Sequence, residues 1–284
     1  MAVQIIIDSA ADYDKQEIEE KGLTCVPLTI TFGEKSYRDC LELTKEAFYG
    51  MLLEKKEYPK TSQPSPDNFL QHFIRAKENG DSVVAILLSA GVSGTYQSAN
   101  IAKQMAEYEN IYLIDSATAT SAIRILVEKA IEMREDNRPA AEIAAFIEKL
   151  KHRVKIYAAV DTLEYLYRGG RVTRAQAGVG ELARLKPLIT LTAEGKVEVW
   201  SKCIGGKKAM AQLLKMLASV RVDPAYEFLF VYSHDRENCE KFQGFLAEKG
   251  YDVADKELYS IGSTIGAHTG SGAFGFIFVE AEES

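Results

Sequence analysis

The feature that most constrains the fold is an apolar run that passes through serine and glycine into a helical pattern. Residues 83–88 are apolar enough for a buried strand, and the helical pattern carries Ile101 and Met105. A strand that turns sharply into a helix leaves free backbone N–H groups at the helix start, which favour an anionic group. Ser93 lies in this turn, where it either caps the helix or adds a hydrogen bond to such a group.

The same arrangement recurs along the first half of the chain. Residues 4–8 and 111–115 are further apolar runs, each followed by Ser9 or Ser116. Helical patterns separate these runs, which predicts an α/β fold with a mostly parallel sheet and helices on both faces. Ligands of such sheets lie beyond the carboxyl ends of the strands, where Ser9, Ser93 and Ser116 all fall.

The remaining segments follow from local composition. We expect one strand at residues 26–32, an extended proline-rich segment at 59–66, and a solvated loop at 132–138. Residue 157 begins a second unit with a β-hairpin at 185–200. The predicted organisation is therefore an N-terminal α/β domain at 1–154 and a C-terminal α/β domain with a mixed sheet at 155–284.

Charge and composition exclude several classes of function. The net charge is −7 and there is no basic tail, so nucleic acid is not an expected partner. No apolar run reaches the length of a membrane span, and the N-terminus lacks the charged start of a signal peptide, which predicts a cytoplasmic protein. The four cysteines form no C-x-x-C pair, so we expect reduced thiols and no metal site.

Three segments carry residues that are able to do chemistry. Thr61 and Ser62 lie between prolines, His268 lies within a glycine-rich stretch that we expect to be an open loop, and residues 168–174 form a basic glycine loop. A serine hydrolase would need the G-x-S-x-G motif, but the stretch around Ser93 has threonine at the last position. No kinase phosphate loop is present either. Hydroxyls with one histidine suit the binding of a carboxylate better than bond cleavage.

Five segments together resemble the DegV family, whose members bind fatty acids. They are Asp8-Ser9-Ala10-Ala11-Asp12, the segment 61–66, the segment 93–99, the segment 162–171 and the segment 265–270. They span nearly the whole chain in order. One position departs from the resemblance, because Ser271 stands where the family often has proline.

The resemblance implies two α/β domains with a long-chain fatty acid between them and no further cofactor. Thr61 and Ser93 would bind the carboxylate, and the supporting contacts would come from the four residues Ser62, Gly94, His268 and Thr269. It also implies that the protein presents its fatty acid to a separate ATP-dependent kinase, similar to dihydroxyacetone kinases, whose acyl phosphate product feeds phospholipid synthesis. The candidates for docking that kinase are Arg168, Arg171, Arg174 and Lys202.

The physics of lipid binding agrees with neutral hydroxyls at the head group. A tail of ~15 methylenes contributes roughly 12 kcal/mol before the costs of association, so the head group needs only modest hydrogen bonds. An arginine clamp would hold the carboxylate more tightly and hinder its attack on a phosphate. The alternatives are an acyl hydrolase with Ser93 as nucleophile, a phosphotransferase that uses His268, and a lipid store or sensor without a kinase. Transient contact with a membrane is a further expectation for a fatty-acid carrier.

Overall fold

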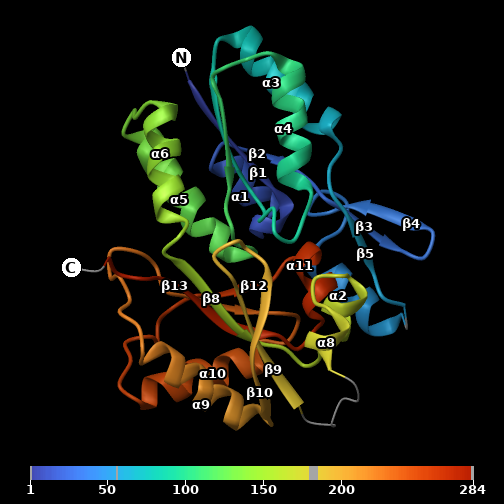
Figure 1. The fold of residues 1–284 in the computed structure, drawn as a ribbon, viewed down its shortest axis with the longest axis vertical. Coiled ribbons are helices and arrows are strands. Elements are labelled where there is room, and N and C mark those ends of the chain that lie inside the picture. The colour runs from blue at the N-terminus through green and yellow to red at the C-terminus, as the bar shows by residue number, and fades with distance from the viewer. Residues whose placement is uncertain (1, 56, 179–184, 283–284) are drawn as a thin grey trace.

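The computed structural model describes residues 2–55, 57–178 and 185–282, and it confirms the predicted α/β class. A parallel sheet of order β2-β1-β6-β7 occupies the upper half of Figure 1. Its strands are β1 (Val3–Asp8), β2 (Leu23–Val26), β6 (Ser82–Leu87) and β7 (Ile111–Asp115). All six residues of β6 are buried, as expected of a central strand with helices on both faces.

Helices cover both faces of this parallel sheet. One face packs against α3 (Pro66–Asn79) and α4 (Thr95–Ala106) through Phe69, Phe73 and Ala102. The other face packs against α5 (Ser121–Glu135) and α6 (Ala140–Leu150). Two short elements follow β1, namely the 3-10 helix η1 (Ser9–Ala11) and α1 (Lys15–Glu20). Ile74 lies next to Phe73 on α3 but is 41% exposed.

A mixed sheet of order β10-β9-β8-β13-β11-β12 forms the lower half of the molecule (Figure 1). Its strands are β8 (Val154–Ala159), β9 (Leu185–Leu191), β10 (Val197–Ile204), β11 (Leu229–Tyr232), β12 (Leu258–Ser260) and β13 (Phe274–Val279). Phenylalanines on β11 and β13 pack against α9 (Gly206–Leu217) and α10 (Glu237–Glu248) on its outer face. The opposite face carries smaller apolar residues, Ile156, Ala158 and Val231 among them, and faces the parallel sheet. The predicted hairpin is present as β9 and β10.

A third, antiparallel sheet of order β4-β3-β5 lies at the side of the molecule. It comprises β3 (Thr29–Phe32), β4 (Lys35–Arg38) and β5 (Lys60–Ser62), and it packs near α2 (Lys45–Glu54) and α11 (Ser263–Thr269). The short helices α7 (Glu164–Arg168) and α8 (Arg174–Ala177) complete the described elements.

Three local predictions are wrong for identifiable reasons. The single strand expected at 26–32 is two strands in different sheets, because Pro27 lacks the N–H that a continuous ladder needs. The loop expected at 132–138 is helical through Glu135, because its charges lie on the exposed side of α5 while Met133 is buried. The open glycine loop around His268 is the helix α11, in which Gly266 allows close packing on the ring of Tyr49.

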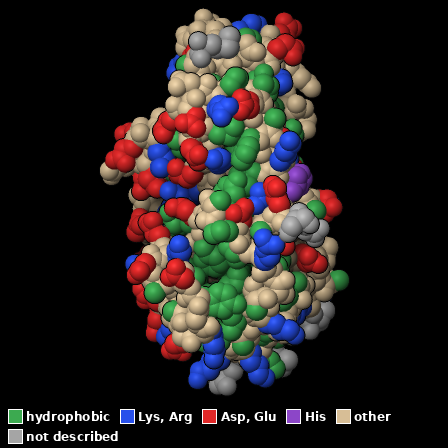
Figure 2. Space-filling model, turned by 90° about the vertical axis from the view of Figure 1, so that its left-hand side faces the viewer, with side chains coloured by type: hydrophobic (Ala, Val, Ile, Leu, Met, Phe, Trp, Pro, Cys, Tyr) green, Lys and Arg blue, Asp and Glu red, His purple; other side chains and the backbone are tan. Residues whose placement is uncertain are grey.

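The surface carries charges of both signs. On the face in Figure 2, acidic and basic side chains are interspersed, most acidic ones toward one margin, and hydrophobic side chains form a strip down the middle. Within residues 2–55, 57–178 and 185–282, no helix is both long and apolar enough to cross a bilayer. The division into domains at residues 154 and 155 stays a prediction.

Candidate functional site

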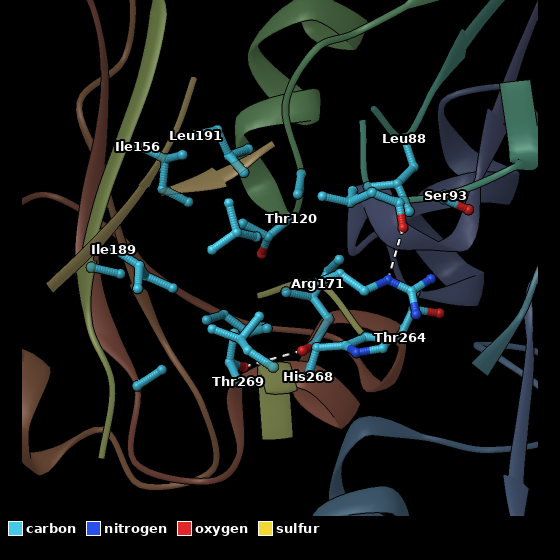
Figure 3. A pocket seen from close by; sticks show the side chains of 18 of the residues that line it. Leu88, Ser93, Thr120, Ile156, Arg171, Ile189, Leu191, Thr264, His268 and Thr269 are labelled. Atoms are coloured by element: carbon cyan, nitrogen blue, oxygen red, sulfur yellow. Dashed lines mark hydrogen bonds between the residues drawn. The ribbon is translucent and has the colours of Figure 1, made fainter. Parts of the chain in front are cut away.

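An apolar cavity lies between the parallel sheet and the mixed sheet. The space between its atoms is about 820 Å³, counting the part that is open to solvent, and about 90 Å³ of it can hold the centre of a water-sized sphere. Most of its wall is aliphatic, with contributions from Leu28, Leu88, Leu166, Ile156, Ile189, Leu191, Val197, Val231 and Ile261. Its polar lining residues include Thr61, Ser93, Arg171 and His268. Figure 3 shows Ser93, Arg171 and His268 on one side and Ile156, Ile189 and Leu191 on the other.

Ser93 reaches this cavity from the loop between β6 and α4. The loop is held tightly, since Ser93 N donates to the carbonyl of Ser89 at 3.1 Å. The Ser93 and Thr95 hydroxyls lie 2.9 Å apart, and Gly94 rather than Ser93 occupies the N-cap position of α4. Gly94 does not line the cavity, because it packs against the side chain of Gln63. The Ser93 hydroxyl still accepts from Thr95 N at 3.3 Å, so it lies at the start of α4 and satisfies the N–H of the first helical residue.

Thr61 enters the cavity from the middle of β5. Its hydroxyl lies 2.8 Å from Nε2 of His268 on α11, so this bond joins segments 207 residues apart. Side chains alternate along a strand, and Ser62 consequently points away from the cavity and is exposed. Thr269, the neighbour of His268, also lines the cavity, but its hydroxyl donates to the carbonyl of Ile265 at 3.1 Å.

The imidazole of His268 is held in its neutral form. Burial and the positive charge of Arg171 lower the pKa of His268 to about 4. Nδ1 is buried without a hydrogen-bond partner, and it lies so close to Gly169 that a Cβ on that glycine would be 2.1 Å away. A neutral ring bonded to Thr61 fixes the direction of the threonine hydroxyl without adding a charge.

Arg171 lines the cavity. Its Nε donates to the carbonyl of Val92 at 2.9 Å, as drawn in Figure 3, and its Nη1 donates to the carbonyl of Gly169. Burial lowers the pKa of this guanidinium, which has no carboxylate partner among its hydrogen bonds in the described chain. The expectation of a head-group environment made only of neutral groups is corrected here, because a half-buried cation stands beside the hydroxyls.

The other three basic candidates lie outside the cavity. Arg168 is exposed, pairs with Glu164 and stacks over the ring of Tyr58 at 4.1 Å. Arg174 is exposed at the start of α8. Lys202 on β10 donates to the carbonyl of Gln176 at 3.0 Å, which ties β10 to α8.

A second, more polar pocket adjoins the cavity from the outside. Thr61, Arg171 and His268 line both spaces. The outer pocket adds Lys60 and Arg168, with Glu57 and the rings of Tyr58 and Tyr165. A group held by Thr61 would therefore have the apolar cavity on one side and a largely basic, open pocket on the other.

Three further threonines of the wall, Thr120, Thr190 and Thr264, were missed from the sequence. The Thr190 hydroxyl donates to the carbonyl of Ile156 at 2.7 Å. Thr120 donates its hydroxyl to Asp12, and Thr264 donates to Asp39 at 2.6 Å. Both carboxylates are buried, and burial raises the pKa of Asp12 to about 6. Because the hydroxyls of Thr120 and Thr264 are bonded to carboxylates, neither residue presents a free polar group to the cavity. The Asp-Ser-Ala-Ala-Asp segment was the available signal, but it does not name the partners.

The geometry does not favour nucleophilic catalysis by Ser93. An activated serine needs a base within hydrogen-bond reach. The hydroxyl of Ser93 is paired with Thr95, and the ring of His268 is bonded to Thr61 instead. In the part of the chain that the structure describes, no group of three His, Cys, Asp or Glu side chains is placed to hold a metal ion.

Comparison with known proteins identifies the family. The profile of the DegV family, described as uncharacterised proteins, matches residues 2–281. The chain belongs to the DegV family. A DegV domain-containing protein of Caldanaerobacter subterraneus is 33% identical over 279 residues, covering 98% of this chain and 99% of the relative. A second one, from Listeria innocua, is 33% identical over 275 residues and covers 96% of each chain.

Solved DegV structures have the same fold. A fatty-acid-binding DegV family protein from Thermus thermophilus superposes with a TM-score of 0.86 at 31% identity, covering 99% of this chain and 100% of that one. A fatty-acid-binding DegV family protein from Streptococcus agalactiae gives 0.88 at 26% identity, with 99% and 100% coverage. A stearic-acid-binding protein from Eubacterium ventriosum gives 0.82 at 26% identity, with 99% and 98% coverage.

Proposed function

We propose that this DegV protein binds one long-chain fatty acid, with the carboxylate at Thr61 and Ser93 and the tail in the apolar cavity. The observation that carries the proposal is the juxtaposition of polar groups with an aliphatic wall in one cavity. The fatty-acid-binding relatives of the same fold support the substrate class. The cavity lies between the parallel sheet and the mixed sheet, and we propose that these belong to separate domains at 1–154 and 155–284.

The head-group residues suit a carboxylate. Hydroxyl donors from Thr61 and Ser93 supply hydrogen bonds to a charged acceptor, each worth about 1.5–3 kcal/mol. The nearby guanidinium of Arg171 offsets the negative charge without requiring an ion pair, because two backbone carbonyls already fix its position. The carboxylate thereby keeps an oxygen available for reaction. Ser62 and Gly94 are not part of this set, since neither lines the cavity.

The tail supplies most of the affinity. Each methylene buried against Ile156, Ile189 or Leu191 contributes about 0.8 kcal/mol, so a chain of sixteen to eighteen carbons outweighs the head group in gross energy. The hydroxyls of Thr120 and Thr264 are engaged by carboxylates and therefore place no unpaired donor beside the tail.

The finer proposal is that the bound acid is presented to a separate ATP-dependent kinase. The outer pocket that shares Thr61, Arg171 and His268 supports this, because its lysine and arginine side chains suit an approaching phosphoryl group. Arg168, Arg174 and Lys202 lie on α7, α8 and β10, where α8 contacts both α7 and Lys202, and they are candidates for docking that partner.

The experiment is identification of the lipid that purified protein carries. The protein is denatured, and the solvent extract and the intact chain are analysed by mass spectrometry. A free long-chain acid, recovered at close to one per protein chain, supports the proposal. An acyl adduct on Ser93 would instead establish a hydrolase, and a lipid without a free carboxyl would contradict the head-group assignment.

The kinase step is tested separately by reconstitution with ATP and a dihydroxyacetone-kinase-like partner, with hydroxylamine to trap acyl phosphate. Trapping only with the partner present supports the carrier. Product from the protein alone would point to the phosphotransferase, and no product with an active partner would leave a lipid store or sensor. Arg174→Ala tests the docking surface. It should lower turnover with the partner, and its fatty-acid affinity, which should stay unchanged, serves as the control.

A further inference from the structure

The fold brings together two cysteines that the sequence keeps fifteen positions apart. Cys25 on β2 and Cys40 in the turn before α2 have their Sγ atoms 3.8 Å apart, and both are free thiols. The other two described cysteines do not share this arrangement. Cys239 is buried with its thiol donating to the carbonyl of Val231, and Cys203 lies on β10.

Hydrogen bonds made by Asp39 fix the turn that carries Cys40 beside β2. Asp39 N donates to the carbonyl of Leu28 at 2.9 Å, and the Asp39 carboxylate accepts from Cys40 N at 2.9 Å. The same carboxylate accepts from Thr264 on α11. Cys40 has a φ of 56°, an uncommon conformation for a residue with a side chain, so the turn is held by its surroundings and not by local preference.

Both cysteines are partly buried, but they differ in their access to an open pocket. Cys40 lines an open polar pocket together with Ser9, Asp12 and Lys45, whereas Cys25 is not among its lining residues. A small polar oxidant therefore meets Cys40 first. The hydrogen bond with Cys40, together with burial, raises the pKa of Cys25 well above its ordinary value, so Cys25 keeps its proton until a partner sulfur is oxidised.

We propose that Cys40 is a peroxide-reactive thiol that Cys25 converts into a reversible disulfide. In the first step the Cys40 thiolate attacks one oxygen of hydrogen peroxide, which gives the sulfenic acid and releases hydroxide. In the second step the Cys25 sulfur attacks the Cys40 sulfur, the Cys25 proton leaves with the sulfenic oxygen as water, and the S–S bond forms. A dithiol reductant reverses the sequence. Formation of this disulfide does not depend on whether the protein binds a fatty acid.

The disulfide would connect the cavity wall to redox state. Cys40 directly follows Asp39, whose carboxylate accepts a hydrogen bond from Thr264 in the wall of the cavity. Closing the bond ties this turn covalently to β2 of the parallel sheet. We therefore expect oxidation to change the dissociation rate of a bound fatty acid, measured before and after treatment with dithiothreitol.

The test uses a Cys203→Ser, Cys239→Ser chain, which isolates the pair. Peroxide should lower the intact mass by about 2 Da and link the tryptic peptides 22–35 and 39–45, and dithiothreitol should restore both. With Cys25→Ala added, Cys40 should instead be trapped by dimedone as a sulfenic acid. With Cys40→Ala added, Cys25 should react at least about tenfold more slowly.

Two results would overturn the proposal. One is the absence of the mass loss at peroxide concentrations that oxidise Cys203 in the unmodified chain. The other is faster trapping of Cys25 than of Cys40, which would reverse the assigned roles. Circular dichroism of each alanine variant shows whether it is folded, and the parent chain carrying both thiols tests the disulfide without either variant.

Discussion

Replacing His268 by glutamine should change how stability depends on pH. Glutamine keeps a polar atom near the Nε2 position that bonds Thr61, but it does not titrate. The pKa of His268 is lowered from 6.5 to about 4 by burial and by Arg171. Between these values the unfolded chain binds a proton that the folded chain does not, so His268 makes the wild type lose stability as pH falls.

The size of the effect follows from the shift. A separation between 6.5 and about 4 corresponds to about 3 kcal/mol, present in full above pH 6.5 and lost as pH falls to about 4. Burial raises the pKa of Asp8 to about 7 and that of Asp12 to about 6, which acts in the opposite direction. Both carboxyls are present in either protein, so they cancel in the comparison of wild type with His268→Gln.

The assay is urea unfolding of both lipid-free proteins at several pH values from 7 to 4. Lipid must be removed because a ligand that binds only the folded state adds its own stability. The difference in unfolding free energy between the proteins should change by about 3 kcal/mol over this range. The reasoning would be refuted if the unfolding free energies of the two proteins changed in parallel with pH. It would also be refuted if the NMR signal of His268, identified by its absence from the variant, titrated above pH 6 in the wild type.

The remaining predictions concern the cavity wall and the tip of the hairpin formed by β9 and β10. Thr61→Val and Ser93→Ala should each weaken palmitate binding roughly 10- to 150-fold in calorimetry, whereas Ser62→Ala should bind like wild type, and equal losses at all three positions would contradict the assignment. Ala158→Leu should reduce affinity for an eighteen-carbon acid more than for a twelve-carbon acid, since it fills tail space, and a uniform loss would place Ala158 away from the tail. Gly195→Ala should lower the melting temperature, because φ is +69° and the new Cβ would lie 1.9 Å from a serine oxygen of the β6–α4 loop; an unchanged melting temperature would mean that the hairpin tip is not docked there.

Much of the fold is predictable because its signals are local. Each of β1, β6 and β7 contains an uninterrupted apolar stretch, at residues 5–7, 83–87 and 111–114, as expected of strands covered on both faces. The predicted hairpin also follows from adjacent residues. The break at Pro27 was visible in the sequence, but the two strands it separates belong to different sheets, and no local pattern reports that choice.

The site was predictable by residue type and less so by geometry. Thr61 and Ser93 reach the cavity, yet Ser62 does not, because β5 alternates its side chains and three residues are too few to show a period. Arg171 looked like a surface cation in a basic loop. Its place at the cavity depends on the carbonyls of Val92 and Gly169, and the contact with Val92 joins segments far apart in the chain.

The contact between Cys25 and Cys40 shows the same limit. Spacing rules for cysteine detect metal sites and redox motifs that are close in sequence. Here the two thiols meet because Asp39 joins Leu28 in the segment after β2, the Cys40 turn and α11 through separate hydrogen bonds. The sequence supports reduced thiols. The fold places the sulfur of Cys25 close enough to Cys40 for a disulfide to be proposed.

A crystal structure with a fatty acid brominated at its last carbon tests the central claim most directly. The account predicts carboxylate density within hydrogen-bond distance of Thr61 and Ser93 and an anomalous bromine peak beside the aliphatic wall that carries Ile156, Ile189 and Leu191. A bromine peak next to Thr61, or a carboxylate held anywhere else, would contradict it.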